Sequence, residues 1–448
     1  MEKHKIKAEY IVRHSPKPVL TIPLIINKYS LYSNLKKTIS VFFCIACSFY
    51  SAKAQIAHDS TMHQKNIFTL AFYKQPGKDS MVDFVDGVYR ILKINKDRSI
   101  GESITEPHLS FIPAVEYSLA TKLAASLNAN YIKPSIHTST KNSTYSTEIK
   151  FTQNKQIIAQ FLSNVWLKNN EYNINTNWSY LKFPQKDFGL GTENNQLTKF
   201  DQIDYSYLKL HQSIVKKIAP NWYVGPGLNI DYRWNISDTT TINKPTYGFT
   251  QYGKTTTSNS TGVTFDLLYD SRTSIVNPLT EAAYFNLSYR TNLKFLGSDY
   301  ALQSITLDAR KYLPFPMHSK NMLAFWTYNV FTLSGKAPYL DIPYTASDRN
   351  LNTGRGYIQG RFRGEKLFFA ESEYRFGITE NGFIGAVVFA NMHSVSEPLQ
   401  KGFQQIKAGY GAGIRIKLNK HSNTNVAIDY AFGQGGSHGI FMNLGEVF

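Results

Sequence analysis

The feature that most constrains the fold is an alternation of apolar and polar side chains with a period of two residues. In residues 368–378 one face carries mostly apolar side chains, whereas the other face carries the charged residues Glu371, Glu373 and Arg375. A period of two residues indicates a β-strand, because successive side chains of a strand point to opposite sides. Such a strand fits a half-buried soluble sheet, and it also fits a membrane barrel that is apolar toward lipid and polar toward its lumen.

The same alternation recurs along the chain, for example in residues 222–234, 284–295 and 406–418. These segments run for about 11 to 13 residues, whereas a tilted membrane strand needs about 9 to 11 and a strand of a soluble protein is usually shorter. Aromatic residues make up 14% of the chain, and aromatic girdles are typical of membrane barrels. No stretch after residue 50 has the ~18 consecutive apolar residues that a membrane-spanning helix requires. The sequence therefore predicts an all-β protein, an antiparallel transmembrane β-barrel.

We count sixteen such segments in residues 108–448. An even number of strands places both ends of a barrel on the same side of the membrane. The three longest connections, near residues 184–199, 236–257 and 335–364, all follow odd-numbered strands. The sequence therefore predicts a 16-stranded barrel with long external loops, short periplasmic turns and both ends in the periplasm.

The beginning of the chain is typical of an export signal. A pair of lysines precedes an apolar run over residues 39–50, and Ala54 ends a group of small residues at the spacing of a signal-peptidase site. We expect residues 1–54 to be a signal peptide with a long amino-terminal region, and the mature chain to begin at Gln55. Residues 55–107 are then a short periplasmic segment ahead of the barrel.

Both cysteines of the chain, Cys44 and Cys47, lie in the apolar run of this signal. Cleavage after Ala54 leaves a mature chain without cysteine, which excludes disulfides, thiolate metal ligands and a cysteine nucleophile. The alternative is a lipoprotein that is processed at Cys47.

Residues 354–364 place three arginines among four glycines, directly before the strand described above. The Arg-Gly-Tyr tripeptide, the Gly-Arg pair that follows and this strand together resemble the lumen loop and next strand of BamA/TamA-type barrels, the outer membrane protein 85 superfamily. The resemblance implies that the loop tip folds back into the barrel and contacts the lumen wall, whereas a glycine-rich surface loop with solvated arginines is the alternative. The loop-motif residues are Arg355, Gly356, Tyr357, Gly360 and Arg361, and the wall candidates are Glu371, Glu373, Arg375 and Asp429.

Two further stretches support the resemblance. Residues 270–272 (Asp-Ser-Arg) with 277–278 (Asn-Pro) are similar to a turn of this family. The terminal aromatic residue Phe448 resembles the tag that outer-membrane barrels present to their assembly machinery, so we expect residues 438–448 to form the closing strand. Where the family usually has an acidic residue and a glycine facing the lumen loop, residues 389–393 read Phe-Ala-Asn-Met-His.

The sequence contains no motif that we interpret as catalytic, metal-binding or cofactor-binding. Residues 435–439 match the Gly-x-Ser-x-Gly pattern of hydrolases, but they lie in a predicted turn between two strands and not at a strand-to-helix elbow. The eleven histidines lack metal-ligand spacing, and Glu371 and Glu373 are expected to pair with lumen arginines. Of the net charge of +17, residues 1–54 carry 9 − 2 = +7, which leaves +10 for the expected mature chain. This excess favours contact with anionic headgroups of outer-membrane lipid and lipopolysaccharide, with solvated loops and lumen as the alternative explanation. No nucleic-acid-binding motif accompanies this charge.

The resemblance covers residues 108–448 and implies a protein of the bacterial outer membrane that inserts or assembles membrane proteins, or translocates polypeptides. Its own insertion would depend on the outer-membrane assembly machinery, and polypeptides would be its clients. Residues 55–107 are too few for the polypeptide-transport-associated (POTRA) modules that precede the barrel in most of the family. The second possibility is therefore a passive pore or structural barrel without insertase activity.

Overall fold

The computed structural model describes most of the chain from residue 108 onward. The described residues are 82–84, 108–133, 141–167, 169–192, 197–239, 248–275, 277–396, 402–419 and 423–448. The expected signal peptide, its cleavage site and nearly all of segment 55–107 lie outside them. Within the described part of the chain, no helix is both long and apolar enough to cross a membrane.

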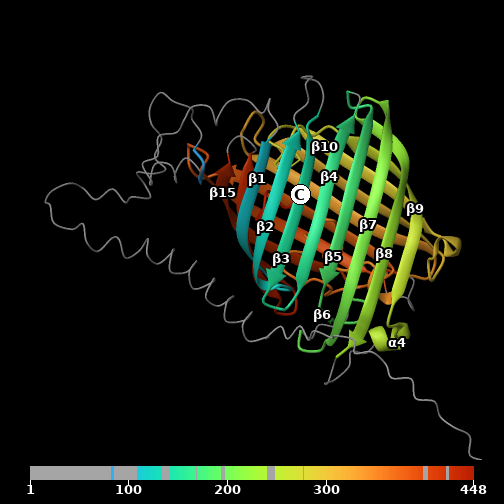
Figure 1. Cartoon of the computed structure of the whole chain (residues 1–448). Coiled ribbons are helices and arrows are strands. Elements are labelled where there is room, and N and C mark those ends of the chain that lie inside the picture. The colour runs from blue at the N-terminus through green and yellow to red at the C-terminus, as the bar shows by residue number, and fades with distance from the viewer. Residues whose placement is uncertain are drawn as a thin grey trace, which may run out of the picture. The chain divides into compact units, whose positions relative to one another are not determined.

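The described barrel consists of antiparallel strands that pair with their neighbours in chain order (Figure 1). The short strand β6 pairs only with the beginning of β7, on the side where β7 also pairs with β5. It therefore does not add a strand to the wall. Of the 17 strands, 16 therefore form the wall, which confirms the predicted 16-stranded antiparallel barrel. The strands are β1 (His108–Ser118), β2 (Lys122–Lys133), β3 (Ser143–Thr152), β4 (Ile157–Leu167), β5 (Tyr172–Lys182), β6 (Gln185–Asp187), β7 (Asp201–Ala219), β8 (Trp222–Asp238), β9 (Ser258–Asp270), β10 (Ala282–Asn292), β11 (Leu302–Pro314), β12 (Met322–Gly335), β13 (Lys366–Gly377), β14 (Ile384–Val395), β15 (Lys407–Asn419), β16 (Thr424–Gly433) and β17 (His438–Leu444).

The alternation in the sequence corresponds to the two faces of the barrel wall. Along β13, every second side chain from Leu367 to Arg375 is buried, and the side chains between them are partly exposed. Because neighbouring strands satisfy each other's backbone groups, such a wall can present an apolar surface to hydrocarbon and a polar surface to the lumen. Large exposed apolar side chains occur on strands all around the barrel: Phe111, Val115, Leu127, Phe151, Trp178, Phe265, Val388 and Ile414.

The three longest connections follow β5, β8 and β12, as the sequence predicted, and they meet at one mouth of the barrel. Phe183, Phe249 and Tyr339, one from each connection, are buried in a single apolar cluster. The short helix α4 (Phe249–Gly253) and the 3₁₀ helix η3 (Tyr339–Asp341) belong to this cluster, and the rings of Phe249 and Tyr339 lie 5.6 Å apart. Because successive strands run in opposite directions, β1 begins and β17 ends at the other mouth.

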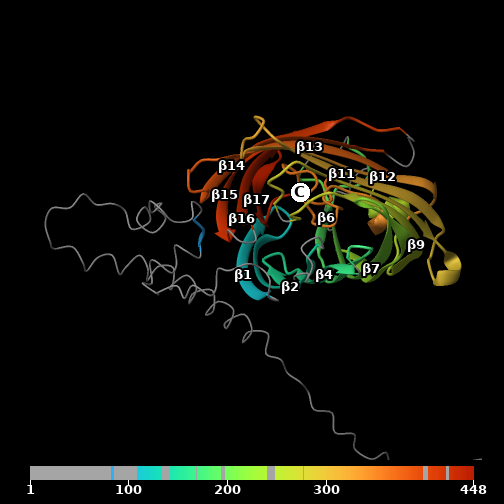
Figure 2. The same ribbon diagram turned by 90° about the horizontal axis from the view of Figure 1, so that it is seen from above.

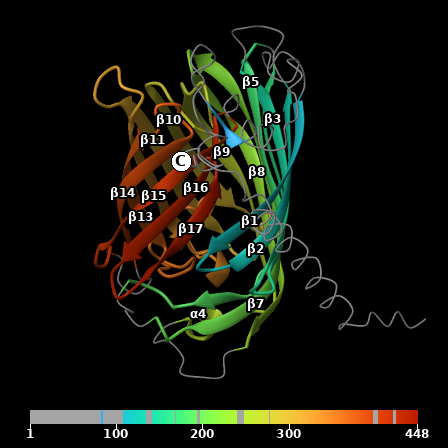
Figure 3. The ribbon, with the colours of Figure 1, turned by 90° about the vertical axis from the view of Figure 1, so that its left-hand side faces the viewer.

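The wall has a seam between β1 and β17 (Figure 3). These strands lie side by side, and a Cβ atom added at Gly439 of β17 would collide with the side chain of Leu119 after β1. In the described residues a hydrogen-bonded ladder joins every consecutive pair of wall strands from β1 to β17, but none returns from β17 to β1. The barrel is therefore nearly closed, and its first and last strands keep an unpaired edge.

The expectation that residues 438–448 form one closing strand is wrong. Strand β17 ends at Leu444, and Gly445 has a φ of 93°, a conformation that glycine adopts without the strain that a Cβ atom causes. The N–H of Gly445 donates to the carbonyl of Asn425 at 2.7 Å. The last three residues, the tail Glu446–Phe448, leave the wall at this turn and enter the lumen.

Candidate functional site

The connection between β12 and β13, residues 336–365, folds back into the barrel and is called the lumen loop below (Figure 2). Its base is fixed by Arg363, whose side chain is fully buried. Arg363 Nη1 donates to the carbonyls of Tyr339 and Ile342 at 3.1 and 3.2 Å, and Arg363 Nε lies 3.4 Å from a carboxylate oxygen of Asp187. These contacts hold the loop at the mouth where the long connections meet.

The middle of the lumen loop is a compact turn around Asp348. Its Oδ1 accepts the backbone N–H groups of Asn352 and Thr353 at 2.9 and 2.7 Å. Aspartate stabilises turns in this way, because its short side chain reaches backbone donors a few residues ahead. The turn presents Arg349 to the wall, where its Nη2 donates to the carbonyl of Thr176 at 3.0 Å.

Arg355, the tip of the lumen loop, is 1% exposed and surrounded by carboxylates. Its Nη2 lies 2.6 Å from Glu371 Oε1, its Nη1 lies 2.5 Å from Asp429 Oδ2, and it also forms an ion pair with Glu373. The guanidinium carbon lies 3.6 Å from the centre of the Phe389 ring. Burial opposes the charged form, but the three carboxylates outweigh it and raise the pKa of Arg355 above its ordinary value. The structure thus places the tip in the lumen against three of the wall candidates.

The backbone of the tip is fixed by the turn between β16 and β17. Ser437 Oγ donates to the carbonyl of Gly356 at 2.6 Å, so the serine of the hydrolase-like pattern lies in a turn and supports the loop. The hydroxyl of Tyr357 donates to the carbonyl of Ala408 at 2.6 Å and accepts the N–H of Gln434 at 2.8 Å. Both residues after Arg355 are therefore attached to the wall.

Glycines of β15 make room for the tip. A Cβ atom at Gly409 would lie 2.6 Å from the carbonyl oxygen of Arg355, and one at Gly411 would lie 2.6 Å from the ring of Phe389. Asn391, within residues 389–393, donates through Nδ2 to the same carbonyl of Arg355 at 2.9 Å. The acidic partners of Arg355 come instead from β13 and β16.

The ion pairs continue from the loop tip to the tail. Arg415 Nη1 lies 2.5 Å from Asp429 Oδ1, and Arg415 Nε lies 2.7 Å from a carboxylate oxygen of Glu446. Arg375 Nη2 lies 2.7 Å from Glu373 Oε2. Because a buried charge that loses its partner is costly, the loop tip and the tail depend on the same network.

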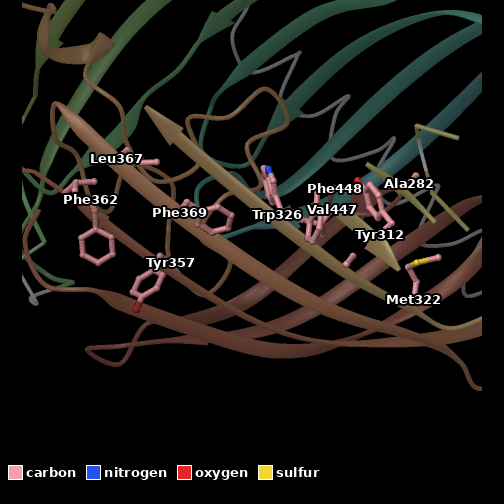
Figure 4. Close-up of a cluster of buried hydrophobic side chains, with 12 residues drawn as sticks. Ala282, Tyr312, Met322, Trp326, Tyr357, Phe362, Leu367, Phe369, Val447 and Phe448 are labelled. Carbon is pink, nitrogen blue, oxygen red and sulfur yellow. The ribbon is translucent and has the colours of Figure 1, made fainter. Parts of the chain in front are cut away.

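The tail ends in an aromatic pocket on the inner face of β11–β13 (Figure 4). The ring centre of Phe448 lies 5.1 Å from that of Trp326 and 6.3 Å from that of Tyr312. Arg375 Nη2 donates to the backbone carbonyl oxygen of Phe448 at 2.9 Å. Phe448 is thus a lumen residue in this structure and not the end of a wall strand.

The other loop-motif residues lie apart from this network. The Gly360 N–H donates to the carbonyl of Thr345 at 2.9 Å, within the loop. The guanidinium carbon of Arg361 lies 4.7 Å from the centre of the Phe188 ring, and burial lowers the pKa of Arg361 to about 10. Four residues beyond the predicted motif and wall candidates contact the tip or the tail, and their inward positions follow from strand alternation or from the turn at residue 445: Trp326, Asn391, Arg415 and Glu446.

The part of the lumen beside β4–β12 is hollow. It contains a cavity of about 490 Å³ whose lining is rich in amide, hydroxyl and charged side chains. Asp231 in this lining is 2.7 Å from Arg290 and 3.0 Å from His211. In the described residues, no group of histidine, cysteine, aspartate and glutamate side chains could hold a metal ion. The other polar lining residues include Asn173, Asn175, Gln212, Asn229 and Asn286.

These features define a class of protein, the 16-stranded barrels that carry a loop anchored inside the lumen. The chain belongs to the Omp85 superfamily, because the model of the Omp85 superfamily domain matches residues 114–434. Barrels of this family are bacterial outer-membrane proteins, and the resemblance that the sequence suggested is thereby confirmed.

Solved structures agree with this assignment at the level of the fold. BamA from Haemophilus ducreyi lacking POTRA domains 1-3 is 13% identical with a TM-score of 0.50, over 76% of this chain and 70% of that one. CdiB from Escherichia coli is 6% identical with a TM-score of 0.50, over 84% of this chain and 73% of that one. A search of curated proteins gave no match.

Proposed function

We propose that this protein is located in the bacterial outer membrane and inserts or translocates polypeptides there. The observation that carries the proposal is the seam, where β1 and β17 lie side by side without a ladder. Membership of the Omp85 superfamily supports it, as does the similarity of the fold to BamA and CdiB.

The seam suits insertion for a physical reason. In hydrocarbon every backbone N–H and C=O group must be paired, so a closed barrel has no edge to offer to another chain. An unpaired strand edge, by contrast, can accept an added strand through main-chain hydrogen bonds. The eleven residues of β1 provide such an edge beside the seven residues of β17. A client strand would form there before it leaves for the lipid.

The second candidate function is a passive pore, which the hollow part of the lumen favours. Many polar and charged side chains line the cavity of about 490 Å³, as expected for a path for solutes. Conductance across planar bilayers tests this candidate directly. A steady open current that persists when the loop is immobilised would favour the pore.

The proposed function is tested by a disulfide across the seam. Residues 55–448 contain no cysteine, so an introduced pair has no native competitor. Leu119→Cys with Gly439→Cys places one cysteine on each side of the seam, where the two residues are in contact. Tyr430→Cys with Ile440→Cys is the matched control, because these residues already face each other in the ladder between β16 and β17.

We expect the oxidised seam variant to lose insertion of client barrels and to regain it after reduction, whereas the control variant works in both states. Full insertion by the oxidised seam variant, with the crosslink verified on gels, would contradict the proposal.

A further inference from the structure

The cavity beside β4–β12 has the size and the lining of a site for a small polar ligand. Its volume of about 490 Å³ lies within the ~300–1,000 Å³ that is common for small-molecule sites. Ten asparagine or glutamine side chains line it, together with nine serines or threonines. Amide groups donate and accept hydrogen bonds, as the hydroxyl groups of a sugar do. The buried Nδ2 of Asn292 in this lining has no hydrogen-bond partner in the described residues, although buried donors are almost always paired.

The lining contains a lysine without an acidic partner. Lys209 on β7 is partly buried, and in the described part of the chain it forms no ion pair with a carboxylate. Asp231 lies opposite Lys209 in the ladder between β7 and β8. Its carboxylate oxygens already contact His211 at 3.0 Å and Arg290 at 2.7 Å. Because an unpaired charge in a partly enclosed space is costly, Lys209 indicates an anion that the chain itself does not supply.

The lumen loop brings a second cation of this kind, Arg349, into the same cavity. Its guanidinium donates to the side chain of Asn175 and to the carbonyl of Thr176, both of which are neutral groups. The charge of Arg349 is among those that act on Lys209, so the two cations lie in the same part of the cavity. A guanidinium and an ammonium together are suited to a carboxylate or a phosphate.

The carboxylates of the lining do not cancel this positive charge. Five of them already pair with cations or with backbone donors: Glu148, Asp231, Asp308, Asp341 and Asp348. The remaining carboxylate, Asp266, lies six residues along β9 from Ser260, which is level with Lys209 because both lie opposite Asp231. At ~3.3 Å per residue this separation is about 20 Å. The excess of positive charge is therefore local to Lys209 and Arg349.

We propose that this cavity binds a small acidic saccharide, a sugar that carries a carboxylate or a phosphate. The anionic group lies between Lys209 and Arg349, and the hydroxyl groups bind the amide side chains of the lining. Lys209 belongs to the wall and Arg349 to the lumen loop, so the bound sugar connects the loop to the wall. The inference does not depend on the proposed function, because it uses only the chemistry of the cavity.

The test is isothermal titration calorimetry of the folded barrel in detergent with glucuronate, glucose phosphate, glucose and inorganic phosphate. We expect saturable binding of the two acidic sugars. Neutral glucose should bind at least about tenfold more weakly, because a charge-assisted hydrogen bond is lost. Inorganic phosphate should also bind more weakly than glucose phosphate, since it offers no ring hydroxyls to the amides.

Variants of Lys209 locate the site. Lys209→Gln should weaken binding of the acidic sugars about tenfold or more and leave the weak binding of glucose unchanged, whereas Lys209→Arg, which keeps the charge, should retain binding. Lys311→Gln is the matched control, because it removes the same charge from a side chain that is 44% exposed and pairs with Glu281. Heat resistance on gels verifies that each variant is folded. If Lys209→Gln does not fold, the comparison of acidic and neutral sugars on the wild-type barrel decides.

Equal binding of glucuronate and glucose would overturn the inference, because the two cations would then play no part. Absence of saturable binding of either acidic sugar at millimolar concentrations would also overturn it and would mean that water alone solvates Lys209. Equal binding of inorganic phosphate and glucose phosphate would overturn the assignment to a saccharide. None of these results depends on insertion activity, which the seam disulfide measures separately.

Discussion

The two parts of the lumen differ in how they are filled. Beside β12–β17, the loop tip and the tail are packed against the wall, and Arg355, Glu373 and Asp429 are almost completely buried. Beside β4–β12, polar side chains line a cavity of about 490 Å³. We call the first region the packed part of the lumen and the second region the hollow part. The difference begins in the sequence, because β15 presents glycines to the lumen where β5 presents asparagines.

This comparison indicates where the molecule is rigid. The packed part includes the strand β17 and therefore borders the seam, and its ion pairs connect the loop tip to the tail. The hollow part contacts the lumen loop through Arg349, through the ion pair between Arg233 and Asp341, and through the apolar cluster at the mouth. We infer that substitutions in the packed part affect the loop, the tail and the seam together, whereas those in the hollow part act locally.

The largest effect is expected for Arg355→Ala. It leaves Glu371, Glu373 and Asp429 without their shared partner, and breaking a buried ion pair in this way costs about 3–5 kcal/mol. Arg349→Ala is the control in the hollow part, with an expected cost of about 1–2 kcal/mol, since it removes hydrogen bonds to neutral groups. Denaturant unfolding in detergent measures both values.

Protease treatment of whole cells adds a second measurement for the same variants. We expect the barrel with Arg355→Ala to assemble and its lumen loop to become cleavable, while the wild-type loop resists. Equal cleavage of both would show that the ion pairs do not anchor the loop.

A smaller loss is expected for Gly411→Leu. The Cβ atom alone would lie 2.2 Å from the carbonyl oxygen of Tyr430 on β16 and 2.6 Å from the ring of Phe389, on which Arg355 stacks. Overpacking of this kind costs about 1–3 kcal/mol. Gly402→Leu is the control, because nothing lies within 4 Å of a Cβ atom there. Thermal unfolding followed by gel mobility compares the two. Identical unfolding temperatures for the Gly411→Leu and Gly402→Leu variants would mean that the packed part accommodates a larger side chain more easily than its contacts indicate.

Phe448→Ala is expected to release the tail with little effect on the barrel. Burial of a phenylalanine side chain contributes ~1.5–3 kcal/mol, which is small beside a wall of hydrogen-bonded strands. Carboxypeptidase should trim the variant in detergent and leave the wild-type terminus intact, while both keep their heat resistance. We also expect a lower amount of inserted protein, since the terminal aromatic residue is the predicted assembly signal. Protection of the variant terminus would contradict the docking of the tail through Phe448.

The smallest effect is expected for Asn229→Ala in the hollow part. Asn229 lines the cavity, where water can replace its hydrogen bonds, so the free energy of unfolding should change by less than about 0.5 kcal/mol. If the same gel assay showed a loss of stability for Asn229→Ala as large as that for Gly411→Leu, the packed and hollow parts would not differ in rigidity.

Much of the fold could be predicted from the sequence, because alternation determines which face of a strand each residue occupies. The inward positions of Glu371, Glu373 and Asp429 follow from this alternation alone. Whether these three carboxylates contact Arg355 depends on how far the lumen loop extends into the barrel. The alternation of side chains carries no information about that depth. The prediction that the tip reaches the lumen wall came only from the resemblance of the Arg-Gly-Tyr tripeptide to a known lumen loop.

The tail and the seam could not be predicted in the same way. The alternation in β17 ends at Leu444, and Gly445 was not interpreted as a turn because the terminal phenylalanine resembled the end of a strand. The seam depends on hydrogen bonds between the first and last strands, which are far apart in the sequence. The signals that could have revealed the inward turn were Gly445 itself and the charge of Glu446, which needs a partner such as Arg415 when it is buried.

Depletion of the protein from growing cells, followed by a quantitative census of outer-membrane proteins, tests the central claim most directly. If the protein inserts or translocates polypeptides, a defined set of them should fall in the outer membrane while their precursors accumulate in the periplasm. Complementation with the seam-disulfide variant should restore the set only under reducing conditions. An unchanged census in depleted cells would contradict the account.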